Sequence, residues 1–369
     1  MHADDAWPDL RSRARGLVVG YCLGDALGRA PEPRRAQLVA GTPSMLFLSS
    51  TEGLVRALVR EQLTGLGGGL ADACWHATTR WAHRSRRDTL AGVVDRREAA
   101  EPGSWPDGWL SEIAMLQSGR GSAPAIEAAL DLGRDLDPRP GYSASDSIGD
   151  LVLARVLPVA LLAAARPTAD LATDLSAAAR DVAAYTHGLV GQVLAVALTR
   201  TLAHTLATGA VHPLVGLPDL SELYLGVPHA DEVVRARVAL RAVADHLPPN
   251  PRTSSDISHG VPSGPRSALR AMTEGLHCAL TYPQRDQVAD ALEEVLTATP
   301  QPAASAVTFA LLGAAHGIEA LPPDAVARLD VGHVADQLAV DLLTQAERHP
   351  LASSNGEAAK AWLRRYPPS

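Results

Sequence analysis

The sequence has little cysteine, and its cysteines are widely separated. Cys22, Cys74 and Cys278 form no CxxC pair, so they indicate neither a disulfide framework nor a thiolate zinc site. The first residues also lack a basic segment followed by an apolar core, which is the pattern of a secretory signal. A reducing compartment, the cytoplasm, is therefore the expected location.

Positive charge is not in excess either. The formal net charge is −8, and Lys360 is the only lysine among 33 basic residues. This balance predicts binding to neither nucleic acid nor an anionic membrane surface. The longest apolar stretch, Leu151 to Ala165, is interrupted by Arg155 and Pro158, which predicts a buried core helix and no membrane span.

Runs of β-branched and aromatic residues are absent, as are several catalytic signatures. Aromatic residues make up 4% of the chain, and there is no GxxxxGK[ST], HExxH, GxSxG or EF-hand pattern. Apolar residues recur instead at helical spacing, which predicts an all-α fold. The expected helices span residues 11–28, 52–64, 70–92, 108–118, 122–134, 149–165, 169–186, 188–208, 230–247, 265–281, 284–297, 303–318 and 333–347.

Domain number is left open by length and composition. A chain of 369 residues that is 46% hydrophobic can bury a large core, as two domains or as one large domain. The breaks between expected helices are rich in proline and glycine, but none has the length or polarity of an interdomain linker.

The first expected helix carries an unusual row of glycines. Gly16, Gly20, Gly24 and Gly28 are spaced four residues apart and therefore share one face. Interior glycines cost such a helix about 2–4 kcal/mol, and close approach of another helix backbone would offset that cost. Asp25 lies beside this face, and a buried acid there needs hydrogen-bond donors or a cation.

These residues carry a family resemblance. Residues 15–28, RGLVVGYCLGDALG, followed by Pro31-Glu32, resemble the opening signature of ADP-ribosylglycohydrolases of the dinitrogenase-reductase-activating type. Three later segments resemble the family in the same order, and they are residues 149–158 (GDLVLARVLP), 186–188 (THG) and 309–322 (FALLGAAHGIEALP). The resembling blocks run from about residue 13 to 322. The resemblance implies one compact all-α domain over residues 1–369.

The family implies a metal-dependent chemistry, and this chain lacks most of the residues that would hold the metal. Its members typically release ADP-ribose from modified groups with two Mg²⁺ ions, held by a Thr-Asp-Asp run and a later Asp-x-Asp run. Two adjacent dications need several carboxylates. Laid over this sequence, the two runs fall on Ser50, Thr51, Glu52, Pro300, Pro302 and Ala303. No acidic residue occurs from Thr297 to Phe309, so we expect the family's magnesium to be lost and no other cofactor to replace it.

Candidate site residues follow from the same overlay. We expect ligand contacts from Asp25, Thr51, Arg155 and His187, and, if the chain is active, catalysis by Glu32, Glu52 and Asp150. Each has a structural alternative. Glu52 could complement a helix dipole, Glu32 could be an exposed loop charge and Asp150 could cap a helix. The structural alternative for Arg155 is a buried ion pair, and that for His187 is a core histidine whose hydrogen bonds are all satisfied.

Three functions remain open. The first is a pseudoenzyme or regulatory protein that binds ADP-ribose or a related nucleotide. The second is an active ADP-ribosyl hydrolase with a rebuilt or metal-poor site. The third is an all-α scaffold that binds a protein partner.

Overall fold

The described part of the chain is helical throughout. The computed structural model describes residues 8–67, 69–85, 105–131, 145–166, 171–216, 230–245, 267–298, 301–348, 351 and 356–368. Within these ranges the regular elements are α-helices and short 3₁₀ turns (η), and two isolated bridges, Leu38 with Leu329 and Gly149 with Ser267, are the only β pairings. The elements are α1 (Leu10–Leu27), α2 (Thr42–Thr64), α3 (Leu70–Arg84), α5 (Trp109–Glu112), η3 (Ala114–Gln117), α6 (Pro124–Asp131), α7 (Leu151–Ala165), α8 (Leu171–Ala184), α9 (Leu189–Thr208), η4 (Pro213–Gly216), α11 (Ala230–Asp245), α13 (Ala268–Thr281), η5 (Arg285–Gln287), α14 (Val288–Ala298), α15 (Pro302–His316), η6 (Ile318–Ala320), α16 (Pro323–Ala327), α17 (Gly332–Arg348) and α18 (Gly356–Arg365).

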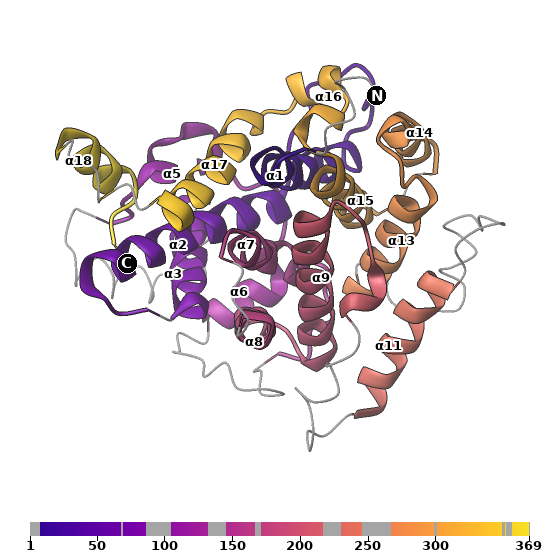
Figure 1. The fold of residues 1–369 in the computed structure, drawn as a ribbon, viewed down its shortest axis with the longest axis horizontal. Helices are drawn as coiled ribbons and strands as arrows, with labels where there is room; N and C mark the ends of the chain where they lie inside the picture. The colour runs from indigo at the N-terminus through magenta and orange to yellow at the C-terminus, as the bar shows by residue number, and fades with distance from the viewer. Residues whose placement is uncertain are drawn as a thin grey trace.

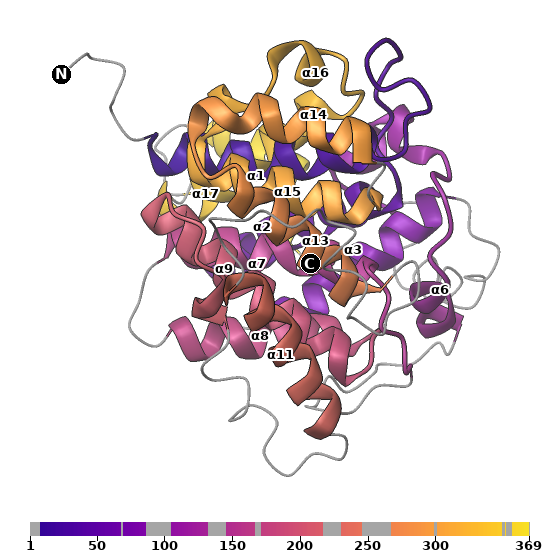
Figure 2. The same cartoon turned by 90° about the vertical axis from the view of Figure 1, so that its right-hand side faces the viewer.

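The helices surround one hydrophobic core. Helices α1, α2, α7, α9 and α15 supply most of its buried residues, while α11, α14 and α18 lie at the periphery (Figure 1). Two parts of the sequence that are far apart meet in the centre, because α1 runs alongside α15 (Figure 2). The prediction of a single all-α domain is confirmed.

One predicted boundary is wrong. The helix expected at 52–64 begins at Thr42, and the segment before it, which the sequence assigns to a loop, is its first half. Pro43 at the first turn and Gly41 at the N-cap are the start signals. The apolar run Met45–Leu48 hides the helical period because this helix is buried on all sides there.

Some expected helices extend beyond the described residues. The ends that lie outside them are 86–92, 132–134, 169–170, 246–247 and 265–266. The short helices α16 and α18 were not expected from the sequence.

The glycine face of α1 packs directly on the backbone of α15. A Cβ placed on Gly16, Gly20 or Gly24 would lie 2.2 Å from a carbonyl oxygen of Gly313, Phe309 or Ser305, respectively. At Gly28 the same atom would lie 2.6 Å from the Cα of Pro302. The prediction that the glycines permit close helix packing is confirmed, and the contact determines which end of α15 meets which end of α1.

Helix α9 is long and apolar enough to cross a bilayer by composition alone, and it is the only such helix among the described residues. Neighbouring helices bury 72% of its most apolar window, as expected for a core helix. The shorter α7 is also buried along most of its length, as the sequence predicts.

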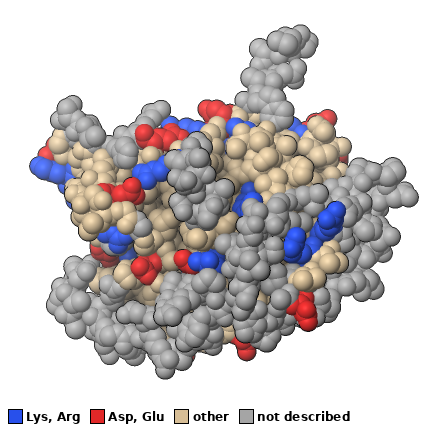
Figure 3. Space-filling model, turned by 60° about the horizontal axis from the view of Figure 1, so that its bottom comes forward, with Lys and Arg blue, Asp and Glu red and all other residues tan. Residues whose placement is uncertain are grey.

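Charged side chains do not gather by sign on the face shown in Figure 3. Over its described surface, basic and acidic residues alternate among uncharged ones.

The α1–α15 contact predicts a large effect of a single methyl group. Gly20→Ala should destabilise the protein by at least about 3 kcal/mol, because the clash involves two backbones and cannot be relieved by a side-chain rotation. Chemical denaturation measures this change. Gly356→Ala is the control, since a Cβ there meets nothing within 4 Å, and its stability should equal or slightly exceed that of the wild type. Equal stabilities for the two variants would contradict the close contact.

Candidate functional site

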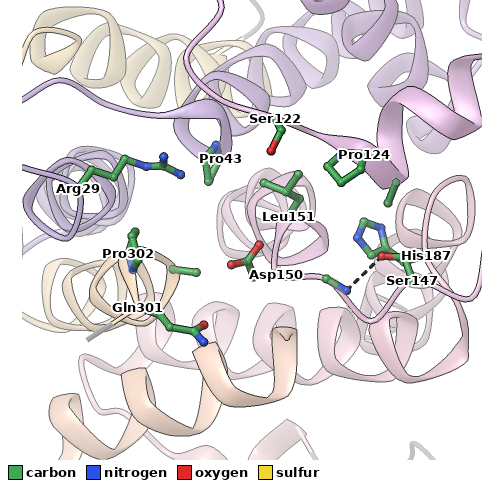
Figure 4. Close-up of a pocket in the computed structure, with 13 residues that line it drawn as sticks. Arg29, Pro43, Ser122, Pro124, Ser147, Asp150, Leu151, His187, Gln301 and Pro302 are labelled. Carbon is green, nitrogen blue, oxygen red and sulfur yellow. Dashed lines mark hydrogen bonds between the residues drawn. The ribbon is translucent and has the colours of Figure 1, made fainter. Parts of the chain in front are cut away.

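A pocket of about 180 Å³ opens where the ends of several helices meet. Figure 4 shows Arg29 and His187 at opposite ends of it, with Pro43, Asp150 and Leu151 between them. The described residues that line it are Arg29, Pro43, Ser122, Pro124, Ala125, Ser147, Gly149, Asp150, Leu151, His187, Gln301, Pro302 and Ala303.

Five helices begin at this pocket. The first or second residue of α2, α6, α7 and α15 lines it, and His187 lies two residues before α9 begins at Leu189. The N-terminus of a helix carries a partial positive charge and N–H groups that lack intrahelical partners. The helix ends that converge here contribute positive potential to the pocket, in addition to the charges of its side chains.

The carboxylate of Asp25 holds one end of the pocket together. Asp25 is fully buried, and its Oδ1 accepts a hydrogen bond of 2.6 Å from Arg29 Nε. Its Oδ2 accepts from the Gly41 backbone N–H at 2.7 Å and from the Ser44 hydroxyl at 2.6 Å. The expected need of Asp25 for donors and a cation is confirmed. Asp25 thus caps α2 from a neighbouring helix, and both of its carboxylate oxygens accept hydrogen bonds from the protein. It is not among the lining residues.

Arg29 is the member of this ion pair that lines the pocket. Its Nε is used by Asp25, while its Nη atoms donate no hydrogen bond to a described residue, and the side chain is 32% exposed. Gly28, the preceding residue, packs on Pro302, which places Arg29 next to the start of α15. The pocket therefore contains a guanidinium with a free fork of donors.

His187 forms the opposite end. It is fully buried, and burial, followed by the nearby charge of Arg155, lowers its pKa to about 3, so the imidazole is neutral at pH 7. Its Nδ1 lies 2.7 Å from the Thr186 hydroxyl, and its Nε2 has no hydrogen-bond partner. His187 is thus not the fully satisfied core histidine of the alternative interpretation.

Asp150 is the one carboxylate in the lining. It is partly exposed and occupies the N-cap position of α7, but its side chain makes no capping hydrogen bond. The capping alternative is therefore wrong for this residue, and its carboxylate faces the middle of the pocket in Figure 4.

The lining does not fit a pair of magnesium ions. Two octahedral dications need several oxygen ligands, mostly carboxylates, and the pocket offers Asp150 alone. Pro43 and Pro302 stand at the starts of α2 and α15, where proline supplies no ligating side chain. Among the described residues, no group of three or more acids, histidines or cysteines is placed to hold a metal.

The first metal run was expected at Ser50–Glu52, at the start of a helix, and this placement fails with the helix boundary. Because α2 begins at Thr42, these residues lie inside the helix, are buried, and do not line the pocket. Thr51 donates to the Phe47 carbonyl oxygen at 2.9 Å. The residues at the helix start beside the pocket are instead Thr42, Pro43 and Ser44, which bring no carboxylate.

Glu52 belongs to a separate buried cluster. Its Oε1 accepts from the Leu110 backbone N–H at 3.3 Å, and its Oε2 lies 4.0 Å from Arg80 Nε. The alternative that it complements a helix dipole is wrong, because it stands in the middle of α2. Burial lowers the pKa of Arg80 to about 9, and Arg56 adds to this shift, so the cluster is structural and positive.

The remaining expected residues are dispersed. Glu32 is exposed and outside the lining, as its loop alternative holds. Arg155 is fully buried behind His187, and no ion pair joins it to a described carboxylate, contrary to the structural expectation. Pro300 lies outside the described residues, whereas Pro302 and Ala303 line the pocket.

Sequence reasoning missed Arg29 and Gly149. Arg29 follows Asp25 by four residues, a spacing that pairs opposite charges on one helix face, so a signal was present. Arginine is the general basic residue of this chain, and that abundance hid the signal.

Removing the Asp25 carboxylate should loosen this end of the pocket. Asp25→Ala leaves Arg29 without its partner and two donors at the start of α2 unsatisfied, so the free energy of unfolding should fall by about 2–4 kcal/mol. Urea titration provides the measurement. Asp131→Ala, at an exposed carboxylate, should change stability by less than about 0.5 kcal/mol. A similarly small loss for Asp25→Ala would show that its three hydrogen bonds, to Arg29, Gly41 and Ser44, are dispensable.

The lowered pKa of His187 predicts a pH effect. The unfolded chain binds this proton near pH 6.5 and the folded chain near pH 3, so folding stability falls as pH drops below about 6.5. From pH 7 to pH 5, His187 should account for a loss of about 2 kcal/mol, which His187→Gln removes. Denaturation curves at the two pH values measure the difference. The exposed His333, changed to Gln, should leave the wild-type pH dependence intact, and an intact dependence in His187→Gln would refute the prediction.

Comparisons with known proteins agree with this architecture. The family model described as ADP-ribosylglycohydrolase matches residues 6–351. A solved structure described as "ADP-ribosylglycohydrolase-related protein complex" superposes with a TM-score of 0.50 at 17% identity, over 92% of this chain and 99% of that one, which shows likeness of fold alone. No curated protein compared with the chain matches it. The family match spans nearly the whole chain, and the chain therefore belongs to the ADP-ribosylglycohydrolase family.

Proposed function

We propose that this protein is a non-hydrolytic member of the family that binds ADP-ribose or a related nucleotide without a divalent metal. The observation that carries the proposal is the charge of the pocket. Five helix N-termini and the guanidinium of Arg29, which is paired with the buried Asp25, face it, and Asp150 is the one carboxylate among its described lining residues. A site of that sign suits an anion and repels a dication.

Arg29 takes over the electrostatic role that magnesium has in active relatives. The two acidic runs of the family hold cations beside the ligand. Here Pro43 and Pro302 stand at the two helix starts, and Arg29 lies beside them. A guanidinium is permanently charged and its paired N–H groups match two phosphate oxygens.

The size of the pocket limits what it encloses. Its volume of about 180 Å³ is below the range of about 300–1,000 Å³ that encloses a drug-sized ligand. We infer that it encloses part of the ligand, a ribose with its adjoining phosphate, and that the rest lies over the open side. The presence of this cavity supports a ligand-binding protein over a pure scaffold.

The pocket does not provide the pair of catalytic groups that glycosidic hydrolysis commonly uses. Cleavage of a glycosidic bond commonly uses two carboxyl groups, one to assist the leaving group and one to activate water or attack. Asp150 is the one carboxylate of the lining, and the pocket does not fit the metal pair that would otherwise activate water. The competing function, a metal-poor hydrolase, would have to rely on Asp150, because Glu32 and Glu52 lie elsewhere.

Calorimetric titration with ADP-ribose tests the binding. We expect the same dissociation constant in excess EDTA and in excess MgCl₂, because the cation of the site is Arg29. Arg29→Gln should weaken binding by about 10- to 100-fold, as for loss of a charge-assisted hydrogen bond. Arg35→Gln, at an exposed arginine outside the pocket, is the control and should bind as the wild type does. Binding that requires Mg²⁺, or that survives Arg29→Gln unchanged, would refute the proposal.

The same protein preparations are then assayed for hydrolysis. Release of free ADP-ribose from an ADP-ribosylated arginine peptide should not exceed the rate in buffer. A turnover that disappears in Asp150→Asn would establish the hydrolase instead. A protein that neither binds ADP-ribose nor releases it would leave the scaffold as the better account.

A further inference from the structure

A line of three polar side chains leads from the core to the pocket. Arg155, on α7, donates from Nη1 to the Thr186 hydroxyl, and that hydroxyl lies 2.7 Å from Nδ1 of His187. All three side chains are fully buried, and the line ends at His187 Nε2, which has no partner and belongs to a residue of the pocket wall. The proposed function assigns no role to Arg155 or Thr186.

The donors in this line determine where the imidazole carries its proton. A guanidinium only donates, so the Thr186 oxygen accepts from Arg155. The Thr186 hydroxyl proton then needs an acceptor, and His187 Nδ1 is the one within hydrogen-bond distance among the described residues. Either tautomer leaves one buried donor without a protein acceptor, but the Thr186 hydroxyl has no other acceptor among the described residues, whereas a proton on Nε2 belongs to a residue of the pocket wall, where a ligand can accept it. Nδ1 therefore accepts, and the proton of the neutral ring is on Nε2.

The ring is also held in orientation. Gly191 leaves room for it, because a Cβ at that position would lie 3.0 Å from His187 Cβ. The Gln192 side chain donates to the His187 carbonyl oxygen at 3.0 Å. His187 Nε2 is itself buried, and a Cβ at Gly149, in the pocket lining, would lie 3.6 Å from it, in van der Waals contact.

We propose that Arg155 and Thr186 are positioning residues that hold His187 as the neutral Nε2–H tautomer, which presents an uncharged hydrogen-bond donor to the ligand. The low pKa of His187 agrees with this arrangement, since burial and the charge of Arg155 both disfavour a second proton. The buried cation thus has a use that compensates for its lack of a carboxylate partner.

This arrangement assigns different chemistry to the two ends of the pocket. Arg29 provides a charged fork for an anionic group, whereas His187 provides one neutral N–H for an oxygen that accepts a hydrogen bond. A ligand that offered an N–H donor at the His187 end would leave two buried donors facing each other and would be rejected. The ligand class is therefore an anion that also carries an acceptor oxygen on its uncharged part.

Nitrogen-15 NMR of the full-length protein, labelled at histidine and free of ligand, tests the tautomer directly. We expect the His187 signals, identified by their absence in His187→Gln, to show a protonated Nε2 and an unprotonated Nδ1 at pH 7. Thr186→Ser should keep this pattern, because the hydroxyl remains. Thr186→Val should convert a large fraction to the Nδ1–H form or to a mixture. Nδ1–H or a doubly protonated ring in the wild type, or no change in Thr186→Val, would overturn the proposal.

Affinity supplies the second readout, and it rests on the proposed binding of ADP-ribose. Thr186→Val should weaken binding by about tenfold, whereas Thr186→Ser should stay within about twofold. Gly149→Ala should weaken binding with the tautomer unchanged, because its methyl group covers Nε2. If the tautomer is as expected and ADP-ribose does not bind, the proposed ligand is wrong and the positioning role stands. If ADP-ribose binds and the tautomer is the other one, the positioning role is wrong.

Discussion

The close contact between α1 and α15 is the constraint on which the rest of the structure depends. Four glycines in α1 let its backbone touch that of α15, so the register between the two helices has almost no freedom. Gly28 then stands against Pro302, and the last turn of α1 lies at the start of α15. Asp25, in the same turn, receives the start of α2. One rigid contact between distant parts of the sequence therefore gathers the helix starts that form the pocket.

The electrostatics of the pocket follow from what those helix starts carry. Two of them, those of α2 and α15, place a proline at the pocket, and two have an acid beside them, because Asp25 caps α2 and Asp150 precedes α7. The Asp25 carboxylate is already neutralised by Arg29 and three further donor atoms. The pocket thus contains groups of both signs, and the proposed anion binding depends on the Nη donors that Arg29 does not use on Asp25.

The opposite end of the pocket shows how a buried charge can be tolerated. Desolvation lowers the pKa of Arg155 to about 10, which still leaves it charged at neutral pH. It forms no ion pair with a described carboxylate, and its Nη1 donates to the Thr186 hydroxyl. This charge is linked to the pocket through hydrogen bonds, because Arg155 donates to Thr186 and the Thr186 hydroxyl contacts His187. His187 is the residue of the three that lines the pocket.

The sequence by itself determined the properties that depend on local order along the chain. Helical periodicity predicted the all-α class, the four-residue spacing of glycines predicted a close helix contact, and the absence of acids from Thr297 to Phe309 predicted a defective second metal run. The start of α2 was decided by tertiary structure, because the carboxylate that caps it comes from α1. The same is true of the site. Glu52 was expected in it and lies in another cluster, while Arg29 was not expected and lies in it. Spacing reports which residues share a helix face, but which faces and ends meet is decided by packing between helices far apart in sequence.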